Sequence, residues 1–124
     1  MKTNVGLNLQ RDSRIGSVSD CEVKYIAWGD GDPVMDGTDT TLANEVGRKA
    51  VTSLVSGGIG IASIVLYITE AEANGTITEI GFFAGASASA TPGSGVLTDI
   101  FEWTHTKNSG HSLQLVLTDT HSRS

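Results

Sequence analysis

Apolar and polar residues alternate along most of the chain from residue 22 onward, and short turn-forming stretches separate the alternating segments. A period of two is typical of β-strands. Val23, Tyr25 and Ala27 begin the pattern, and Gly29–Pro33 (GDGDP) ends the first strand with strong turn formers. Further strands are expected over 48–55, 59–69, 76–84, 96–106 and 112–118. Regular strands joined by glycine-bearing turns predict an all-β fold, a small antiparallel β-sandwich or barrel-like domain.

One short helix is expected between the first two strands. Asp39 is a suitable N-cap, residues 40–46 supply about two helical turns, and Gly47 fits the position after a helix end. The strand over 59–69 has apolar residues on both faces, which indicates a central strand or one at an interface.

The ends of the chain are more polar than its middle. In the stretch 1–21, Val5, Leu7 and Leu9 alternate with polar residues, so this N-terminal arm is a candidate interface segment that adds to a neighbour's sheet. The β-sandwich domain is expected over 22–118, and 119–124 is expected to be a C-terminal tail.

Length and charge limit the functions that the chain can have. Its 124 residues suffice for one domain. The net charge is -6 and the basic residues are scattered, which argues against nucleic acid as a partner, because duplex binding needs clustered Lys and Arg. The longest apolar run, 59–68, is too short to cross a bilayer as a helix, and the N-terminus lacks the apolar region of a signal peptide. We therefore expect a soluble protein with no membrane partner.

No residue pattern indicates catalysis or a bound metal. The single cysteine, Cys21, has no histidine near it in the sequence, and no nucleophile or phosphate-loop motif is present. The histidines match no zinc spacing: His105, His111 and His121. Four clustered aspartates lack the spacing of an EF-hand: Asp30, Asp32, Asp36 and Asp39. We expect no catalytic residue, no cofactor and no metal site, so an enzyme is the least favoured class.

Three charged residues form a candidate structural corner. Glu45 and Arg48 lie three residues apart at the end of the expected helix, and Glu79 lies in a later strand. We expect Arg48 to pair with Glu45 or Glu79 and to fix how the helix packs on the sheet. The alternative is that all three are solvated surface charges, because a buried ion pair is costly unless it is fully satisfied.

Three segments together resemble a known module. They are YIAWGDG at 25–31, TDTTLANEVGRK at 38–49 and ITEIGFF at 77–83. The chain is similar to a module of tail-fibre and tail-collar-type proteins of tailed bacteriophages. Its pattern is a strand ending in a Gly-x-Gly loop, a D-T-x-L-x-N-E-x-x-R corner and a later I-x-E-I-G-x-F strand.

The resemblance implies a non-enzymatic structural subunit of the virion, assembled in the host cytoplasm and bound to other virion proteins. No repetitive β-shaft accompanies the module, which favours a small adaptor, baseplate, collar or capsid-decorating subunit over a long fibre. Of these roles, a tail-associated subunit (fibre, collar or baseplate adaptor) is the favoured one. Because virion parts repeat by symmetry, a homo-oligomer is expected, with a trimer as one option.

Two alternative functions stay open. The chain could be a capsid decoration or cement protein that binds the major capsid protein. It could also be a carbohydrate-binding module, with aromatic side chains as stacking faces: Tyr25, Trp28, Phe82, Phe83 and Trp103.

Overall fold

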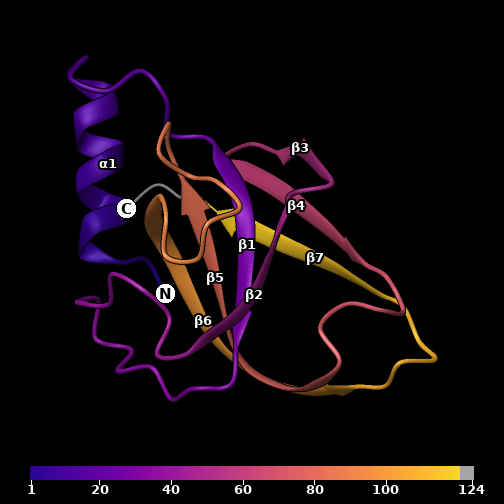
Figure 1. The fold of residues 1–124 in the computed structure, drawn as a ribbon. Helices are drawn as coiled ribbons and strands as arrows, with labels where there is room; N and C mark the ends of the chain where they lie inside the picture. Colours follow the sequence, from indigo (N-terminus) through magenta and orange to yellow (C-terminus); the bar gives the residue numbers. More distant parts are fainter. Residues whose placement is uncertain (121–124) are drawn as a thin grey trace.

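The computed structural model describes residues 1–120, which form two antiparallel β-sheets and, within that range, one helix (Figure 1). The elements are α1 (Asn4–Arg14), β1 (Val23–Gly29), β2 (Glu45–Ala50), β3 (Ser53–Gly58), β4 (Ile61–Ile68), β5 (Gly75–Ala84), β6 (Val96–Lys107) and β7 (Leu113–Thr120). The strand order is β2-β1-β5-β6 in sheet A and β3-β4-β7 in sheet B. The prediction of a small all-β, sandwich-like domain with one short helix is confirmed.

The main core lies between the two sheets. Its buried members are Ile26, Trp28, Ile64, Leu66, Ile68, Ile77, Ile80, Phe82 and Leu115. The Trp28 ring covers Gly47 of the neighbouring strand, where an added Cβ would lie 2.7 Å from the indole carbons. Any side chain at Gly47 would therefore displace the tryptophan from the core.

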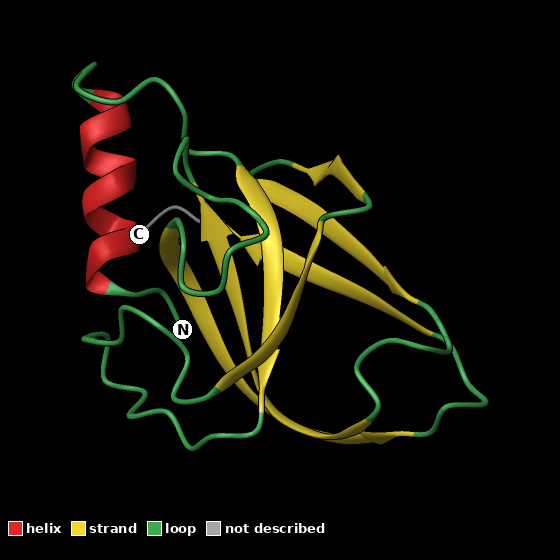
Figure 2. Cartoon of the chain, in the orientation of Figure 1, coloured by secondary structure: helices red, strands yellow, loops and turns green. Residues whose placement is uncertain are grey.

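A second apolar cluster lies on the other face of sheet A. It consists of Ala27, Leu42, Phe83, Leu97 and Ile100. Leu42 comes from loop 30–44, so this loop covers the outer face of sheet A. Figure 1 shows α1 and this loop on the side of sheet A away from β3, β4 and β7. In the secondary-structure view, the outer face of sheet B has no comparable helix over it (Figure 2). Sheet A is thus covered on both faces by the chain itself, whereas sheet B is covered on one.

The N-terminal segment is a helix, so the prediction of an extended arm around Val5, Leu7 and Leu9 was wrong. Thr3 caps α1 by accepting a hydrogen bond from the Gly6 N–H at 3.0 Å. Leu9 is buried, Val5 is half-buried and Leu7 is exposed, which is a helical pattern and not a strand pattern. Val5 and Leu9 are four residues apart, so the alternating pattern also fits one face of a helix. The Thr3 cap favours the helix over the strand.

Gly6 is required where α1 crosses β6. A Cβ at this position would lie 2.6 Å from the Thr98 Cα and 2.7 Å from the Thr98 carbonyl oxygen. Since both atoms are backbone, we expect Gly6→Ala to displace α1 and to lower the free energy of unfolding by about 1–2 kcal/mol, although alanine favours helices.

Chemical denaturation would measure this change. Gly110→Ala is the matched control, because an added Cβ there meets nothing within 4 Å. Equal stability of Gly6→Ala and the wild-type protein would contradict the close packing of α1 on β6.

The helix predicted over 40–46 is absent, and this prediction was wrong. Residues 40–44 form bends without regular secondary structure, and β2 begins at Glu45. The N–H groups of Ala43 and Asn44 donate to the Glu79 carboxylate. These two N–H groups therefore bind a carboxylate that is distant in the sequence, whereas in a helix they would bind carbonyl oxygens of the preceding turn.

The strand predicted over 48–55 is two strands in different sheets. β2 ends at Ala50, and β3 begins at Ser53 after the chain has crossed from sheet A to sheet B. The last strand also differs, because β7 includes Asp119 and Thr120, which were predicted to belong to the tail. The remainder of that predicted tail, 121–124, lies outside the described residues.

Candidate functional site

Glu79 is the buried acceptor that fastens loop 30–44 to sheet A. Its side chain comes from β5 and is 0% exposed. It accepts hydrogen bonds from the backbone N–H groups of Gly31 at 2.9 Å, Ala43 at 2.7 Å and Asn44 at 2.8 Å. A carboxylate bonded to three N–H groups is well satisfied without a basic partner.

Two glycines at the start of this loop, Gly29 and Gly31, are required for steric reasons. A Cβ on Gly31 would lie 2.6 Å from the Glu79 Oε2 atom, and one on Gly29 would lie 2.2 Å from the Asn44 carbonyl oxygen. Only a residue without a side chain lets the loop approach the carboxylate. The Gly-x-Gly pattern and the later glutamate are thus parts of one packing arrangement.

Arg48 and Glu45 form a second buried linkage beside the first. Arg48 Nε donates to Glu45 Oε2 at 2.7 Å and Nη2 donates to Oε1 at 2.8 Å. The two side chains are 2% and 9% exposed. The guanidinium also lies 4.2 Å from the centroid of the Phe83 ring. This two-pronged geometry is the strong form of an Arg–carboxylate pair.

A bulge in β2 brings Glu45 and Arg48 to one face, although their spacing in a regular strand would separate them. Arg48 pairs with Ala27, but Glu45 pairs with Gly29 because the register shifts between Trp28 and Gly29. Both therefore project to the outer face of sheet A. Of the two carboxylates expected to bind Arg48, the structure assigns Glu45.

The same arginine holds loop 86–95. Its Nη1 donates to the Ser94 carbonyl oxygen at 3.0 Å and to the Ser89 carbonyl oxygen at 3.1 Å, while the Gly93 N–H donates to Glu45 at 3.3 Å. Sequence reasoning missed these serines, because their contributions are backbone carbonyls in a low-complexity stretch. It also missed Gly31, Ala43 and Asn44, whose contributions are backbone N–H groups.

Lys49 and Glu72 form a more exposed connection at the crossing from β4 to β5. Lys49 Nζ lies 2.7 Å from Glu72 Oε1, and the Thr69 N–H donates to the same oxygen at 2.9 Å. The hydrogen bond from Lys49, followed by that from Thr69, lowers the pKa of Glu72 from 4.5 to about 2.

This lowered pKa predicts a pH dependence of stability. The ionised Glu72 stabilises the folded state above pH 4.5, and that contribution is lost as the pH falls toward about 2. Both side chains are about a third exposed, so we expect less than about 1 kcal/mol. Glu72→Gln should flatten the decline in stability across this window.

Denaturation followed at several pH values between these limits would measure the effect. Lys49→Met removes the donor and should flatten the same window. A decline as steep as that of the wild-type protein in both variants would contradict this linkage.

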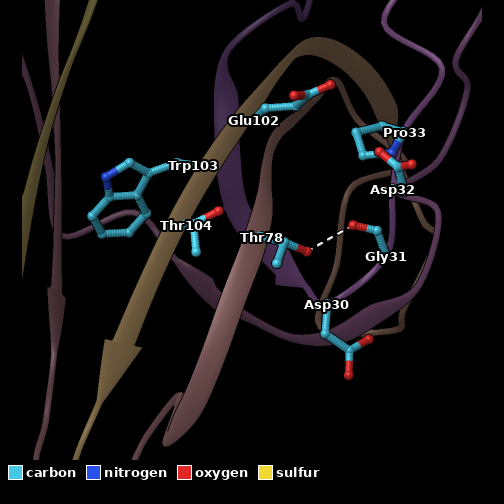
Figure 3. A pocket seen from close by; sticks show the side chains of 8 residues that line it. All are labelled: Asp30, Gly31, Asp32, Pro33, Thr78, Glu102, Trp103 and Thr104. Atoms are coloured by element: carbon cyan, nitrogen blue, oxygen red, sulfur yellow. Dashed lines mark hydrogen bonds between the residues drawn. The ribbon is translucent and has the colours of Figure 1, made fainter.

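A cavity of about 560 Å³ lies where loop 30–44 meets β5 and β6. Its lining comprises Asp30, Gly31, Asp32, Pro33, Thr78, Glu102, Trp103 and Thr104. Figure 3 shows that these side chains point in different directions, with the Trp103 ring on the far side of β6 from Glu102. The Thr78 hydroxyl is used within the cavity, because it donates to the Gly31 carbonyl oxygen at 2.7 Å.

Two features are absent from the described part of the chain. Among residues 1–120, no three His, Cys, Asp or Glu side chains come together in a way that could hold a metal ion. In the same range, no helix has both the length and the apolar character needed to span a membrane.

Most aromatic residues that could have stacked on a sugar are inaccessible. Trp28, Phe82 and Phe83 are buried in the two apolar clusters. Trp103 is half-buried and stacks on His105 with ring centroids 4.9 Å apart. Tyr25 is half-buried as well.

The outer face of sheet B is the candidate interaction surface. From the register, it is formed by Ser53, Val55, Ile61, Ser63, Val65, Tyr67, Gln114, Val116, Thr118 and Thr120. None of these carries a charge, and Val55, Tyr67 and Val116 are exposed. Lys49 reaches the border of this face at Tyr67. Exposed apolar side chains grouped on one uncharged face are typical of a surface that another molecule covers.

Comparison with models of known protein families and with curated proteins finds no match to this chain.

Proposed function

We propose that this protein is a non-enzymatic structural subunit of a bacteriophage virion, associated with the tail as a fibre, collar or baseplate adaptor. It acts through contacts with other virion proteins. The observation that carries the proposal is the contrast between the two sheets. Sheet A is covered by its own loops and helix, whereas the outer face of sheet B is uncharged and exposes Val55, Tyr67 and Val116.

The resemblance to the phage module supports the same role. The three segments that carry it, 25–31, 38–49 and 77–83, meet in space through Glu79 and Arg48. Their residues thus have a shared structural purpose, which is to hold two loops on sheet A. A rigid block with one uncovered face suits a repeated assembly unit.

Immunogold labelling of purified phage particles tests this function. We expect an antibody against this chain to label the tail or its junction with the head. Labelling spread over the head shell would replace the tail assignment with that of a capsid decoration protein. Intact particles and dissociated particle proteins that both lack the chain would refute a virion role altogether.

A further inference from the structure

The outermost strands of the two sheets differ in how they are protected from pairing with another chain. An outermost strand has N–H and C=O groups that no neighbour uses, and proteins usually blunt such edges with charges, proline, bulges or covering segments. Within residues 1–120, the strands that end a sheet are β2, β6, β3 and β7.

Three of these edges carry protection. The β6 edge is covered by the N-terminal segment, since the Thr3 N–H donates to the Thr98 carbonyl oxygen at 3.1 Å and the Ile100 N–H donates to that of Met1 at 2.9 Å. Charged residues protect the other two edges. They are Glu45, Arg48 and Lys49 on β2 and, near the end of β7, Asp119, which Lys2 of the N-terminal segment binds at 2.8 Å.

The β3 edge has neither charge nor proline. Its sequence is SLVSGG, and the whole stretch 50–69 contains no charged residue. A bulge affects only its Gly57 end, so Ser53–Ser56 keeps a regular antiparallel register with β4. Alternate N–H and C=O groups of these residues point away from β4, where a further strand could bond them.

Apolar side chains are exposed around the same edge. Val55 is 54% exposed, and Ile59, at the turn into β4, is 92% exposed. Leu54 is also among the exposed apolar residues. Backbone groups ready to pair and apolar side chains beside them together favour strand addition.

We propose that β3 pairs antiparallel with β3 of a second copy of this chain, about a two-fold axis perpendicular to the sheet. The two copies of sheet B then form one continuous sheet of six strands, β7-β4-β3 followed by its symmetry mate. The inference rests on the proposed assembly role for its biological meaning, but the interface itself can be tested separately.

Charge favours a second copy over a different partner. Each chain carries a net charge of -6, so two copies approach best through a neutral surface. A two-fold axis sets a strand against itself, and any charge on it would meet a like charge. The uncharged β3 meets this requirement, whereas a basic partner strand would find no carboxylate on it to bind.

Symmetry also places Val55 close to its own copy. A two-fold axis perpendicular to the sheet keeps outer-face residues opposite outer-face residues. If the axis passes near Leu54, Val55 or Ser56, then Val55 lies directly across from its copy or one diagonal away, within about 8 Å.

Light scattering coupled to size-exclusion chromatography tests the pairing. We expect the wild-type protein to dimerise, and Val55→Lys and Val55→Glu to weaken dimerisation at least about tenfold each. An equal mixture of the two variants should regain a dimer, because opposite charges then face each other. Val116→Lys is the matched control on β7, since Val116 is 59% exposed on the same face, and it should remain dimeric.

The outcomes separate this inference from the proposed function. A wild-type protein that is monomeric at every concentration overturns the pairing, as does a mixture that stays monomeric or a Val116→Lys variant that dissociates. If the dimer is absent but an antibody against the chain labels the phage tail, the assembly role stands without the dimer. If it dimerises as expected but is absent from virions, the pairing stands and the proposed function fails.

Discussion

Replacing Glu79 with alanine should destabilise the protein more than any other single side-chain truncation proposed here, by about 4 kcal/mol. The carboxylate is fully buried and accepts three backbone hydrogen bonds, so its removal leaves the N–H groups of Gly31, Ala43 and Asn44 without their acceptor. For a chain of this length, the loss corresponds to a fall in melting temperature of about 15 °C. Differential scanning calorimetry would measure it.

Glu79→Gln should have an intermediate effect of about 2 kcal/mol. An amide oxygen in the Oε2 position keeps the bonds from Gly31 and Asn44, but its NH₂ group then faces the donating N–H of Ala43. Glu102→Ala is the matched control, because Glu102 pairs with Glu79 across the strands but is exposed. If Glu79→Ala melted at the same temperature as Glu102→Ala, the carboxylate would not be what holds loop 30–44.

The strands were predictable from the alternation of apolar and polar side chains and from the turn formers between them. In the second half of the chain, the alternation placed three strands within two residues of β5, β6 and β7 at every boundary. β7 packs one face on the main core, and burial on one face is what period-two patterns record. β5 and β6 also contribute to the second apolar cluster and are buried on both faces over part of their length, so the turn formers beside them marked their ends. The crossing between β2 and β3 was missed, because Val51 and Thr52, which join the two strands, are themselves strand-favouring residues and no proline or glycine separates the strands.

The helix was misplaced because local signals compete with distant partners. Asp39 and the following residues resemble a helix start, but the Glu79 carboxylate, 35 and 36 residues from its donors, captures Asn44 and Ala43. A short segment of sequence does not show which distant residues will accept its hydrogen bonds. The charged residues Glu45, Arg48 and Glu79 were visible in the sequence, but the pairing of Glu45 with Arg48 depends on a β-bulge that only the fold shows.

Truncating Arg48 should also be costly, by about 3 kcal/mol, or about 10 °C in melting temperature. Arg48→Ala leaves the nearly buried Glu45 carboxylate without its cation and frees loop 86–95, whose Ser89 and Ser94 carbonyls the guanidinium holds. Arg48→Lys keeps the charge but cannot donate two parallel bonds, so we expect it to recover less than half of the loss. Arg14→Ala, at an exposed arginine of α1, is the control and should melt like the wild-type protein.

A double-mutant cycle separates the ion pair from the other contacts of Arg48. If the pair is the main term, Glu45→Ala combined with Arg48→Ala should cost clearly less than the sum of the single changes, because no unpaired charge is then left buried. Additive effects would mean that the arginine acts through Phe83 and the loop carbonyls and not through Glu45. An unchanged melting temperature in Arg48→Ala would exclude both, and the corner would then be a consequence of the fold and not one of its supports.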